Sequence, residues 1–236
     1  MNKTLIFAAT LNEYPNVVTF IKRLESLNLA LDILIIDDNS IDGTIEFLKK
    51  YQKKNPFFKL IVRSKKMGLD TAHKYAFDYA IKKNYKNLIT LDADLSHEPE
   101  LIPDFIEILK KNDFVIGSRY MKGGSCDMKG FRLLLSVYGN IFIKKFLNIN
   151  SSEFTTSYRG FNQKILKHLQ KTKINSTGYS FFMEVIFHID FMGFKINQTP
   201  IHFRDRISGK SKIAKIEIFR TLLNVFRLKF FRLKKV

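Results

Sequence analysis

The sequence predicts an α/β fold: one domain built on a mostly parallel central sheet, followed by an amphipathic C-terminal helix. Short apolar segments alternate with segments that have helix-like spacing or form turns. After the first apolar segment, Val17, Phe20 and Leu24 recur at the intervals of one helix face. Strands that alternate with helices imply a parallel sheet covered on both faces. Five segments have the length and composition of strands: residues 4–9, 32–36, 59–62, 87–91 and 114–116.

The second half of the chain is less regular and contains two apolar helical segments. Residues 132–147 are apolar on most sides, so we expect a helix that lies against an apolar surface. Residues 213–233 place a wide apolar face opposite arginine and asparagine side chains, which predicts an amphipathic basic helix. Such a helix either lies in the plane of a membrane surface or packs on the domain or on a partner's helix. The predicted division is a domain over residues 1–212 and a helix over residues 213–236.

The charge of the chain indicates an anionic partner. The formal charge is +18, from 40 Lys+Arg against 22 Asp+Glu. Nucleic acid, acidic lipid or a phosphorylated substrate would suit this surplus, unless most of the lysines only solvate the surface. Cys126 is the single cysteine, so no intramolecular disulfide can form and a cytoplasmic location is the default expectation. We expect neither a secretory signal nor a spanning helix, because no apolar run approaches the roughly 18 residues that a bilayer requires.

Polar side chains follow three of the predicted strands. Asn12 and Glu13 follow the first strand, two aspartates follow the second, and two more follow the fourth. In parallel sheets covered by helices, ligands bind at the carboxyl ends of the strands. The sequence therefore predicts a functional site at that edge of the sheet.

Asp92 and Asp94 close the fourth strand, and the period of two along a strand places both carboxylates on one face. Mg²⁺ typically takes one or two protein carboxylates and completes its shell with substrate phosphates, so the pair is a candidate metal site. The alternative is a pair of surface acids at a strand end. His97 is expected to orient a loop, because hard-oxygen sites seldom use imidazole. Cys126 has no histidine nearby in the sequence and is expected to be a small loop residue.

The tract over residues 35–44, IIDDNSIDGT, ends the second strand and enters a helix. Asn39 or Ser40 is placed to cap that helix, which alone would explain much of the tract. The carboxylates of Asp37 and Asp38 would also suit the donor groups of a ribose or a nucleobase. The residues alone leave both interpretations open.

Nine tracts carry a family resemblance over nearly the whole chain: residues 9–13, 35–44, 63–72, 91–106, 115–125, 132–140, 153–161, 178–187 and 203–212. With these tracts in this order, the chain resembles the inverting family 2 glycosyltransferases typified by dolichol-phosphate mannosyltransferase and its bacterial polyprenyl-phosphate relatives. The run DADLSHEP is the most specific match, since the wider family shares D-x-D but not the residues that follow.

The resemblance implies a GT-A fold, which is a Rossmann-like nucleotide-sugar-binding domain, and a role for each matching position. Contacts to the nucleotide sugar are implied for Ala9, Leu11, Glu13, Asp38, Asp92 and Ala93. A divalent cation, Mg²⁺ or Mn²⁺, is implied at Asp92, Asp94 and Ser96. The acceptor phosphate is implied at Arg119, Arg132, Arg206 and Lys212. Catalysis would then depend on Asp94, Arg119 and Arg206.

The implied reaction moves a hexose, mannose first among the candidates, from GDP or UDP to a polyprenyl phosphate with inversion. Negative charge builds on the leaving diphosphate, so a divalent ion and arginine side chains lower the barrier. A lipid phosphate, with a second pKa of about 6 by analogy with phosphorylated side chains, is largely ionised at neutral pH and needs no protein base. The amphipathic segments over residues 213–233 and 132–147 predict a peripheral protein on the cytoplasmic face of a membrane, with a membrane-anchoring partner protein as a further expectation. No nucleic acid is expected as a partner.

Several positions depart from the family pattern. Residues 9–11 replace a Pro-x-Tyr sequence, which removes an aromatic surface for the base. Asp70 stands at a usual glycine, Phe182 at a usual glutamine and Lys210 at a usual acid. The identity of the base and of the hexose therefore stays open.

Three alternatives compete with this interpretation. A transferase of the same fold that adds a sugar to a saccharide hydroxyl, in cell-surface polysaccharide synthesis, would need a carboxylate base, and Asp205 and Glu184 are the candidates. A basic module for nucleic acid is permitted by the charge but not by its distribution, since acids lie at the functional edge. An inactive subunit that only keeps the fold is disfavoured by the intact Asp92, Asp94 and Arg206.

Overall fold

The computed structural model describes residues 3–205 and 215–233, so the predicted acceptor residues Arg206 and Lys212 lie outside the described residues. The strands are β1 (Thr4–Thr10), β2 (Leu31–Asp37), β3 (Phe58–Val62), β4 (Asn87–Thr90), β5 (Phe114–Ser118), β6 (Ser125–Cys126), β7 (Arg159–Asn162), β8 (Asn197–Pro200) and β9 (His202–Phe203). The α-helices are α1 (Tyr14–Ser26), α2 (Thr44–Lys54), α3 (Leu69–Lys82), α4 (Ile102–Lys111), α5 (Gly130–Leu147), α6 (Gln163–Lys171), α7 (Gly178–Phe191) and α8 (Lys215–Leu233).

Seven strands form one sheet in the order β3-β2-β1-β4-β7-β5-β8. Neighbours are parallel except at β7, which runs antiparallel to both β4 and β5. β6 and β9 pair in a separate two-stranded sheet. The predicted mostly parallel sheet is confirmed, and each of the five predicted strands is present with its ends shifted by at most two residues.

The sequence did not predict β7 or β8, whose residues RGFN and NQTP contain no apolar run. Packing explains why β7 fits between two buried neighbours. A Cβ atom at Gly160 would come within 2.8 Å of the Val115 side chain and 2.9 Å of the Leu109 side chain, so glycine permits this close approach. The strand is recognisable only once β4, β5 and α4 surround it.

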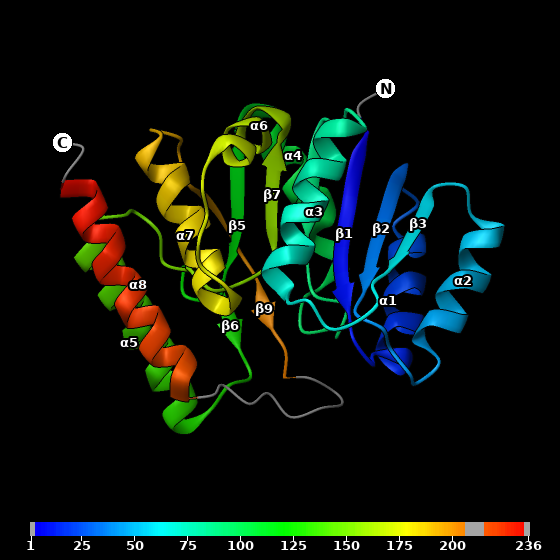
Figure 1. Ribbon diagram of the computed structural model, residues 1–236, viewed down its shortest axis with the longest axis horizontal. Helices are drawn as coiled ribbons and strands as arrows, with labels where there is room; N and C mark the ends of the chain where they lie inside the picture. The colour runs from blue at the N-terminus through cyan, green and yellow to red at the C-terminus, as the bar shows by residue number, and fades with distance from the viewer. Residues whose placement is uncertain (1–2, 206–214, 234–236) are drawn as a thin grey trace.

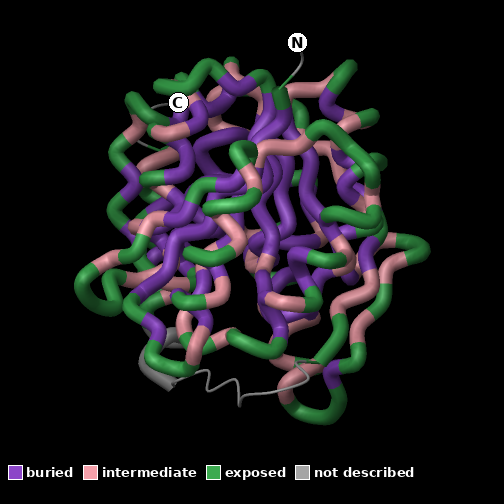
Figure 2. The backbone as a smooth tube through the Cα atoms, turned by 90° about the vertical axis from the view of Figure 1, so that its right-hand side faces the viewer, coloured by how far each residue is buried: buried purple, intermediate pink, exposed green. Residues whose placement is uncertain are grey.

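Two hydrophobic cores lie on opposite faces of the sheet because side chains alternate along each strand. Leu5 and Phe7 of β1 belong to the core that α3, α6 and α7 cover, whereas Ile6 and Ala8 belong to the core that α1, α2 and α4 cover. Figure 1 shows the helices arranged on the two sides of the sheet. In Figure 2 the buried backbone runs through the centre and the exposed backbone surrounds it.

Helices α5 and α8 lie together along one side of the domain (Figure 1). Val225 and Leu228 of α8 are buried in the core, and Arg232 pairs with Asp190 of α7. Of the interpretations that the sequence left open for this helix, packing on the domain is therefore observed for part of its surface. The same helix also exposes apolar side chains, namely Leu222, Leu223, Phe226, Phe230 and Leu233. Within the ranges given above, no helix combines the length and the apolarity needed to cross a membrane.

Candidate active site

The carboxyl ends of β1, β2 and β4 meet at one edge of the sheet, because these three strands are adjacent and parallel. The ends of β1 and β2 lie at the lower edge in Figure 1. Thr10 stands in register with Asp37, and Phe7 with Thr90, so the loops that follow the strands begin side by side. The predicted convergence of the acidic residues on one edge is confirmed.

Asp37 is a fully buried carboxylate that joins the first two of these loops. It accepts a hydrogen bond from the Thr10 hydroxyl at 2.6 Å, and from the amide and the hydroxyl of Ser40 at 2.7 Å each. The Ser40 oxygen in turn accepts from the N–H of Asn12 at 2.8 Å. The Asp37 carboxylate therefore binds other residues of the protein and stabilises the edge of the sheet at which ligands would bind.

The prediction that Asn39 or Ser40 caps the following helix is wrong. Helix α2 begins at Thr44, after Gly43 with a φ of 97°, and the N–H of Thr44 donates to Asp42 Oδ1 at 3.1 Å. The Ser40 hydroxyl donates to Asp37 instead of capping a helix, and α2 starts four residues after Ser40.

Asp38 is buried and forms an ion pair with Arg63, which follows β3. Its second carboxylate oxygen accepts from the N–H of Met67 at 3.2 Å. Arg63 also donates to the Thr71 hydroxyl at 2.6 Å and to the Gly68 carbonyl at 3.2 Å, so its guanidinium fixes the loop between β3 and α3 against the end of β2. Arg63 lies in a tract that matched the family, but the sequence assigned it no role.

Ala9, Leu11 and Glu13 lie at the same edge and are each partly exposed. The Glu13 carboxylate accepts from Asn16 Nδ2 at 2.6 Å, and its N–H donates to the Thr44 hydroxyl at 3.1 Å. These bonds fix the start of α1 beside the start of α2. Ala9 also packs against the hydrophobic core, so only part of its surface is exposed.

Asp92 and Asp94 follow β4 and differ in their surroundings. The side chain of Asp92 is 29% exposed and accepts from the Ser157 hydroxyl at 2.6 Å. Asp94 is buried, and its Oδ1 accepts from the Ser96 N–H at 3.1 Å and the Ser96 hydroxyl at 2.6 Å. Leu95, between Asp94 and Ser96, has a φ of 64°, a left-handed conformation that is uncommon outside glycine and asparagine. Ser96 is fully buried and its hydroxyl donates to Asp94, and its implied role as a metal ligand stays a prediction.

His97 is buried behind this loop, and both of its ring nitrogens are used. The N–H of Asp92 lies 3.1 Å from Nδ1, and since an amide can only donate, Nδ1 accepts and Nε2 carries the proton that is donated to the Thr156 hydroxyl at 3.0 Å. Burial lowers the pKa of His97, although the charges of Asp92 and Asp94 oppose this effect. The expectation that His97 orients the loop is confirmed.

The side-chain oxygen atoms at this loop suit a hard divalent cation whose remaining ligands come from a phosphorylated substrate and from water. Within residues 3–205 and 215–233, no group of three or more His, Cys, Asp and Glu side chains is arranged to bind a metal ion. Asp92 and Asp94 contribute carboxylate oxygens only. Mg²⁺ and Mn²⁺ favour such oxygen ligands and fill the remaining positions with phosphate oxygens and water.

Arg119 follows β5 and forms a buried bidentate ion pair with Glu153. Its Nε and Nη2 donate to the carboxylate at 2.8 and 3.0 Å, and Nη2 also donates to the Thr155 hydroxyl at 3.0 Å. Burial alone would lower the pKa of Arg119, but the charge and hydrogen bonds of Glu153 outweigh it and raise that pKa. This pairing differs from the expectation that the fork of Arg119 is directed at the acceptor phosphate. The sequence contained Glu153 in a matched tract but gave it no role.

Arg204 lies beside the D-x-D loop, and Arg132 lies near Asp205, the residue after Arg204. Arg204, which the sequence analysis did not single out, donates from Nη2 to Glu98 at 2.6 Å and from its N–H to the Ser96 carbonyl at 3.1 Å. Arg132 of α5 places Nη1 3.6 Å from Asp205 Oδ1. The Nε of Arg132 is buried without a hydrogen-bond partner in the described part of the chain, so this guanidinium keeps a donor for an anion.

Glu184 does not suit the role of a general base. Its carboxylate accepts from the Ser176 N–H at 2.8 Å and pairs with Arg227 Nη2 at 2.8 Å. Burial alone would raise its pKa, but the His188 ring at 3.6 Å, hydrogen bonds from Ser176 and the charge of Arg227 lower the pKa to about 2. A carboxylate so stabilised in its charged form accepts a proton poorly at neutral pH.

A parallel sheet that presents acids at its carboxyl edge, with a D-x-D pair held ready for a cation, is the arrangement of the GT-A glycosyltransferases. The comparison with protein families agrees, since the model of Glycosyl transferase family 2 matches residues 6–170. The chain belongs to this family and is a glycosyltransferase.

Relatives of known activity resemble the chain over nearly its full length. It is 30% identical over 226 residues to the undecaprenyl-phosphate mannosyltransferase of Micrococcus luteus, covering 95% of this chain and 93% of that protein. It is 29% identical over 226 residues to the polyprenol monophosphomannose synthase of Mycolicibacterium smegmatis, covering 94% and 85%. The fold is shared with glucosyl-3-phosphoglycerate synthase from Mycobacterium tuberculosis in complex with Mn²⁺, uridine diphosphate and phosphoglyceric acid, with a TM-score of 0.68, 12% identity, and coverage of 97% and 78%.

Proposed function

We propose that the protein transfers mannose from a nucleotide diphosphate sugar to a polyprenyl phosphate with inversion. The observation that carries this proposal is the D-x-D loop, in which Ser157, Ser96 and His97 hold Asp92 and Asp94 at the carboxyl edge of the sheet. The two relatives that span nearly the whole chain supply the substrate classes, mannose and a polyprenyl phosphate.

Asp92 and Asp94 would hold Mg²⁺ or Mn²⁺ against the diphosphate of the donor. The cation would supply positive charge where the leaving diphosphate becomes more negative. Donor contacts are proposed for Glu13, Asp38 and the chain around residues 9–11, with Ala93 between the two acids. Because Arg63 already pairs with Asp38, a ribose hydroxyl would share this carboxylate with the guanidinium.

The acceptor phosphate would be bound by arginine side chains and attack without a protein base. Arg132 supports this role through its buried Nε, which has no hydrogen-bond partner among the described residues. Arg119 would contribute through the side of its guanidinium that Glu153 does not occupy, while Arg206 and Lys212 remain proposals from the resemblance alone. The low pKa of Glu184 removes one of the two candidate bases that a hydroxyl acceptor would need, which leaves Asp205 as the other.

The α5–α8 pair would bring the enzyme to the membrane surface that contains its lipid acceptor. Phe142 stacks on Phe146, and Phe146 packs edge-on against Phe226 at 5.1 Å between ring centroids, so apolar side chains continue from one helix to the other. Phe131 is 79% exposed and Phe230 is 61% exposed on these helices. We propose peripheral binding on the cytoplasmic face, where apolar burial acts together with basic side chains.

The proposal is tested by incubating purified protein with Mn²⁺, a polyprenyl phosphate and labelled GDP-mannose, in parallel with other GDP- and UDP-hexoses. Label is expected in an organic-soluble lipid that mild acid cleaves. Label that enters only water-soluble or polymeric saccharide would contradict the phosphate acceptor and favour the saccharide alternative.

A further inference from the structure

Arg159, the first residue of β7, is a buried arginine that the proposed function does not yet use. It is 1% exposed, and its guanidinium donates to backbone carbonyls. Nε donates to Thr156 at 2.8 Å and Nη2 to Phe154 at 2.9 Å, while Nη1 reaches Phe182 of α7 at 2.8 Å. The guanidinium also lies over the Phe182 ring, 5.0 Å from its centroid. No carboxylate is among the acceptors described for this side chain.

Stability alone is a weak explanation for a charge in this position. Burial lowers the pKa of Arg159 to about 9, and the charge of Glu153 only partly opposes this effect, so the arginine stays charged at neutral pH at a cost in desolvation. Apolar residues that replace a buried charged group often leave a fold as stable as before or more stable. The segment that Arg159 binds offers a better explanation.

That segment consists of residues 153–158, here called the support loop, which lie in no helix or strand. Two oppositely charged side chains bind its backbone. Glu153 Oε1 accepts from the N–H groups of the next three residues at 3.1, 2.9 and 3.3 Å, whereas Arg159 donates to two of the carbonyls. Because an irregular segment has no ladder of backbone hydrogen bonds, these two side chains fix its conformation.

The support loop in turn holds the D-x-D loop. Its Ser157 hydroxyl donates to Asp92 at 2.6 Å, and its Thr156 hydroxyl accepts from His97 Nε2 at 3.0 Å. Arg159 binds the carbonyl of Thr156 itself, one residue before Ser157. The guanidinium is therefore two short steps from the proposed ligand of the cation.

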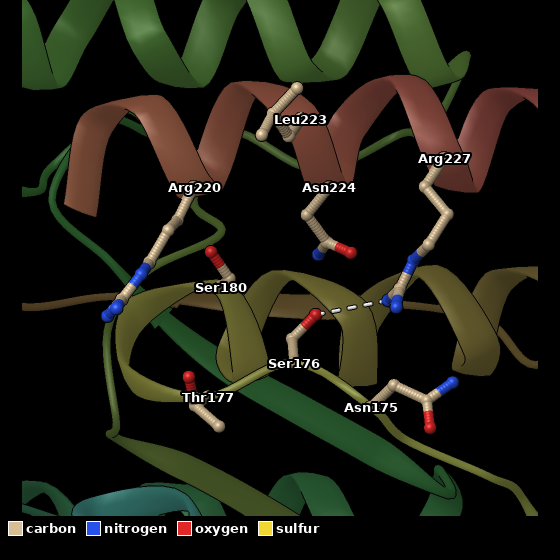
Figure 3. A pocket seen from close by; sticks show the side chains of 8 residues that line it. All are labelled: Asn175, Ser176, Thr177, Ser180, Arg220, Leu223, Asn224 and Arg227. Carbon is tan, nitrogen blue, oxygen red and sulfur yellow. Dashed lines mark hydrogen bonds between the residues drawn. The ribbon is translucent and has the colours of Figure 1, made fainter. Parts of the chain in front are cut away.

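The third bond of Arg159 attaches the support loop to α7, which is itself held by α8. Arg227 of α8 pairs with Glu184 of α7 at 2.8 Å and donates to the Ser176 hydroxyl at 3.2 Å. Figure 3 shows this second bond, with Arg227 directed from α8 toward the start of α7. The carbonyl of Phe182 is thus a fixed point against which Arg159 can hold the loop.

We propose that Arg159 is a positioning residue for the divalent cation, an inference that rests on the proposed function because it takes Asp92 and Asp94 as the ligands. By holding the support loop against α7, Arg159 keeps the Ser157 hydroxyl within hydrogen-bond distance of Asp92. Partners of metal ligands commonly change metal affinity when they are removed, although no ligand is lost.

The test measures the binding of Mn²⁺ to the full chain by electron paramagnetic resonance of the free ion, with GDP or UDP present and the nucleotide alone as blank. Arg159→Met should weaken Mn²⁺ binding about tenfold or more. Arg159→Lys keeps the charge with a different donor geometry and should lose less. This measurement does not depend on catalytic turnover.

Arg232→Met is the matched control. Arg232 also donates to two backbone carbonyls, those of Leu147 and Asn148, and lies over a phenylalanine ring, that of Phe187, but none of these residues is in the support loop. This variant should bind Mn²⁺ as the parent protein does, even if it is less stable. A loss equal to that of Arg159→Met would overturn the inference, because it would reflect general destabilisation.

A double variant tests whether Arg159 acts through the loop. If Arg159 places Ser157, combining Arg159→Met with Ser157→Ala should weaken Mn²⁺ binding by less than the product of the two single effects. Effects that multiply in full would overturn the proposed route.

The assay also separates this inference from the metal assignment. If Arg159→Met binds Mn²⁺ as well as the parent while Asp94→Asn does not, only the inference about Arg159 fails. If the parent binds no Mn²⁺ with either nucleotide, or Asp94→Asn binds it normally, the metal assignment fails and the inference fails with it.

Thermal unfolding shows whether each variant folds. If neither Arg159 variant does, Phe182→Leu takes their place, since it removes the ring beside the guanidinium and leaves the three carbonyl bonds. Loss of this cation–π contact should weaken Mn²⁺ binding about threefold. Unchanged Mn²⁺ binding in Phe182→Leu would then overturn the inference.

Discussion

The hydroxyl of Ser157 donates a 2.6 Å hydrogen bond to the carboxylate of Asp92, and so connects the start of β7 to the D-x-D loop after β4. The Ser157 carbonyl in turn accepts from the Thr90 hydroxyl, which anchors the serine to β4 itself. Asp92 is thereby held in place by the segment that leads into β7, the strand next to β4. This relationship makes Ser157 a positioning residue for the proposed cation.

Ser157→Ala should weaken the apparent affinity for Mn²⁺ by about tenfold or more, as loss of a hydrogen bond to a ligating carboxylate commonly does. The measurement is the Mn²⁺ concentration that gives half-maximal transfer. Ser157→Thr keeps the hydroxyl and should restore most of the affinity. An unchanged metal requirement in Ser157→Ala would show that Asp92 needs no such support.

Asp94→Asn should reduce transfer by about a thousandfold, because the amide removes the negative charge that binds the cation. The asparagine side chain has almost the same shape as the aspartate side chain, so the unfolding temperature should stay close to that of the parent protein. Asp78→Asn is the control, since Asp78 is an exposed acid of α3 that accepts only from Gln170 at 2.9 Å among the bonds described. Transfer near the parental rate in Asp94→Asn would contradict the metal assignment.

Glu153→Gln should lower the free energy of unfolding by about 3 kcal/mol, because it leaves the buried guanidinium of Arg119 without a counter-charge. Urea unfolding at pH 7 measures this change. The double variant Arg119→Met with Glu153→Met should lose less free energy of unfolding than the sum of the losses in the two single variants. Additive losses would mean that the ion pair does not act as a unit.

Glu184 should contribute to the pH dependence of stability. Its folded-state pKa of about 2 lies below its ordinary value of 4.5, so its contribution is complete above pH 4.5 and is lost as the pH falls toward 2. The difference in unfolding free energy between the parent and Glu184→Gln should be about 3 kcal/mol at pH 7 and should shrink across that window. A difference that stays constant between pH 4.5 and 2 would contradict the low pKa.

Replacing Phe226 and Phe230 with serine should reduce binding to vesicles at least about tenfold, because burying an aromatic side chain contributes about 1.5–3 kcal/mol. These side chains are 45% and 61% exposed, so the fold should tolerate the change. Phe57→Ser is the control, since Phe57 is also 61% exposed but precedes β3. Equal losses in the control would argue against a specific membrane-facing surface.

Much of the fold and part of the site could be predicted from local patterns. Five strands were recognisable from their apolar runs, and the positions of Asp92 and Asp94 after a strand placed them at the carboxyl edge. The role of His97 was predictable because imidazole suits a hydrogen-bonded loop better than a hard-cation site. β7 and β8 were not predictable, since their polar sequences become strands only between neighbours that bury them.

The least predictable features are pairs of residues that are distant in the sequence. Arg119 looked like a free phosphate-binding arginine, but folding places Glu153 against its fork. The sequence assigned Arg204 no role, but folding brings its backbone N–H to the Ser96 carbonyl in the loop that follows Asp94.

The sequence by itself determined the strand and helix periods, the acids after the strands and the family, because each depends on residues close together along the chain or on their order. Only the tertiary structure decided which of these residues face a ligand and which face each other. Ser157 and Asp92 are 65 positions apart, and their 2.6 Å contact depends on the register of β7 against β4. Such a contact results from packing the whole sheet, which no local pattern specifies.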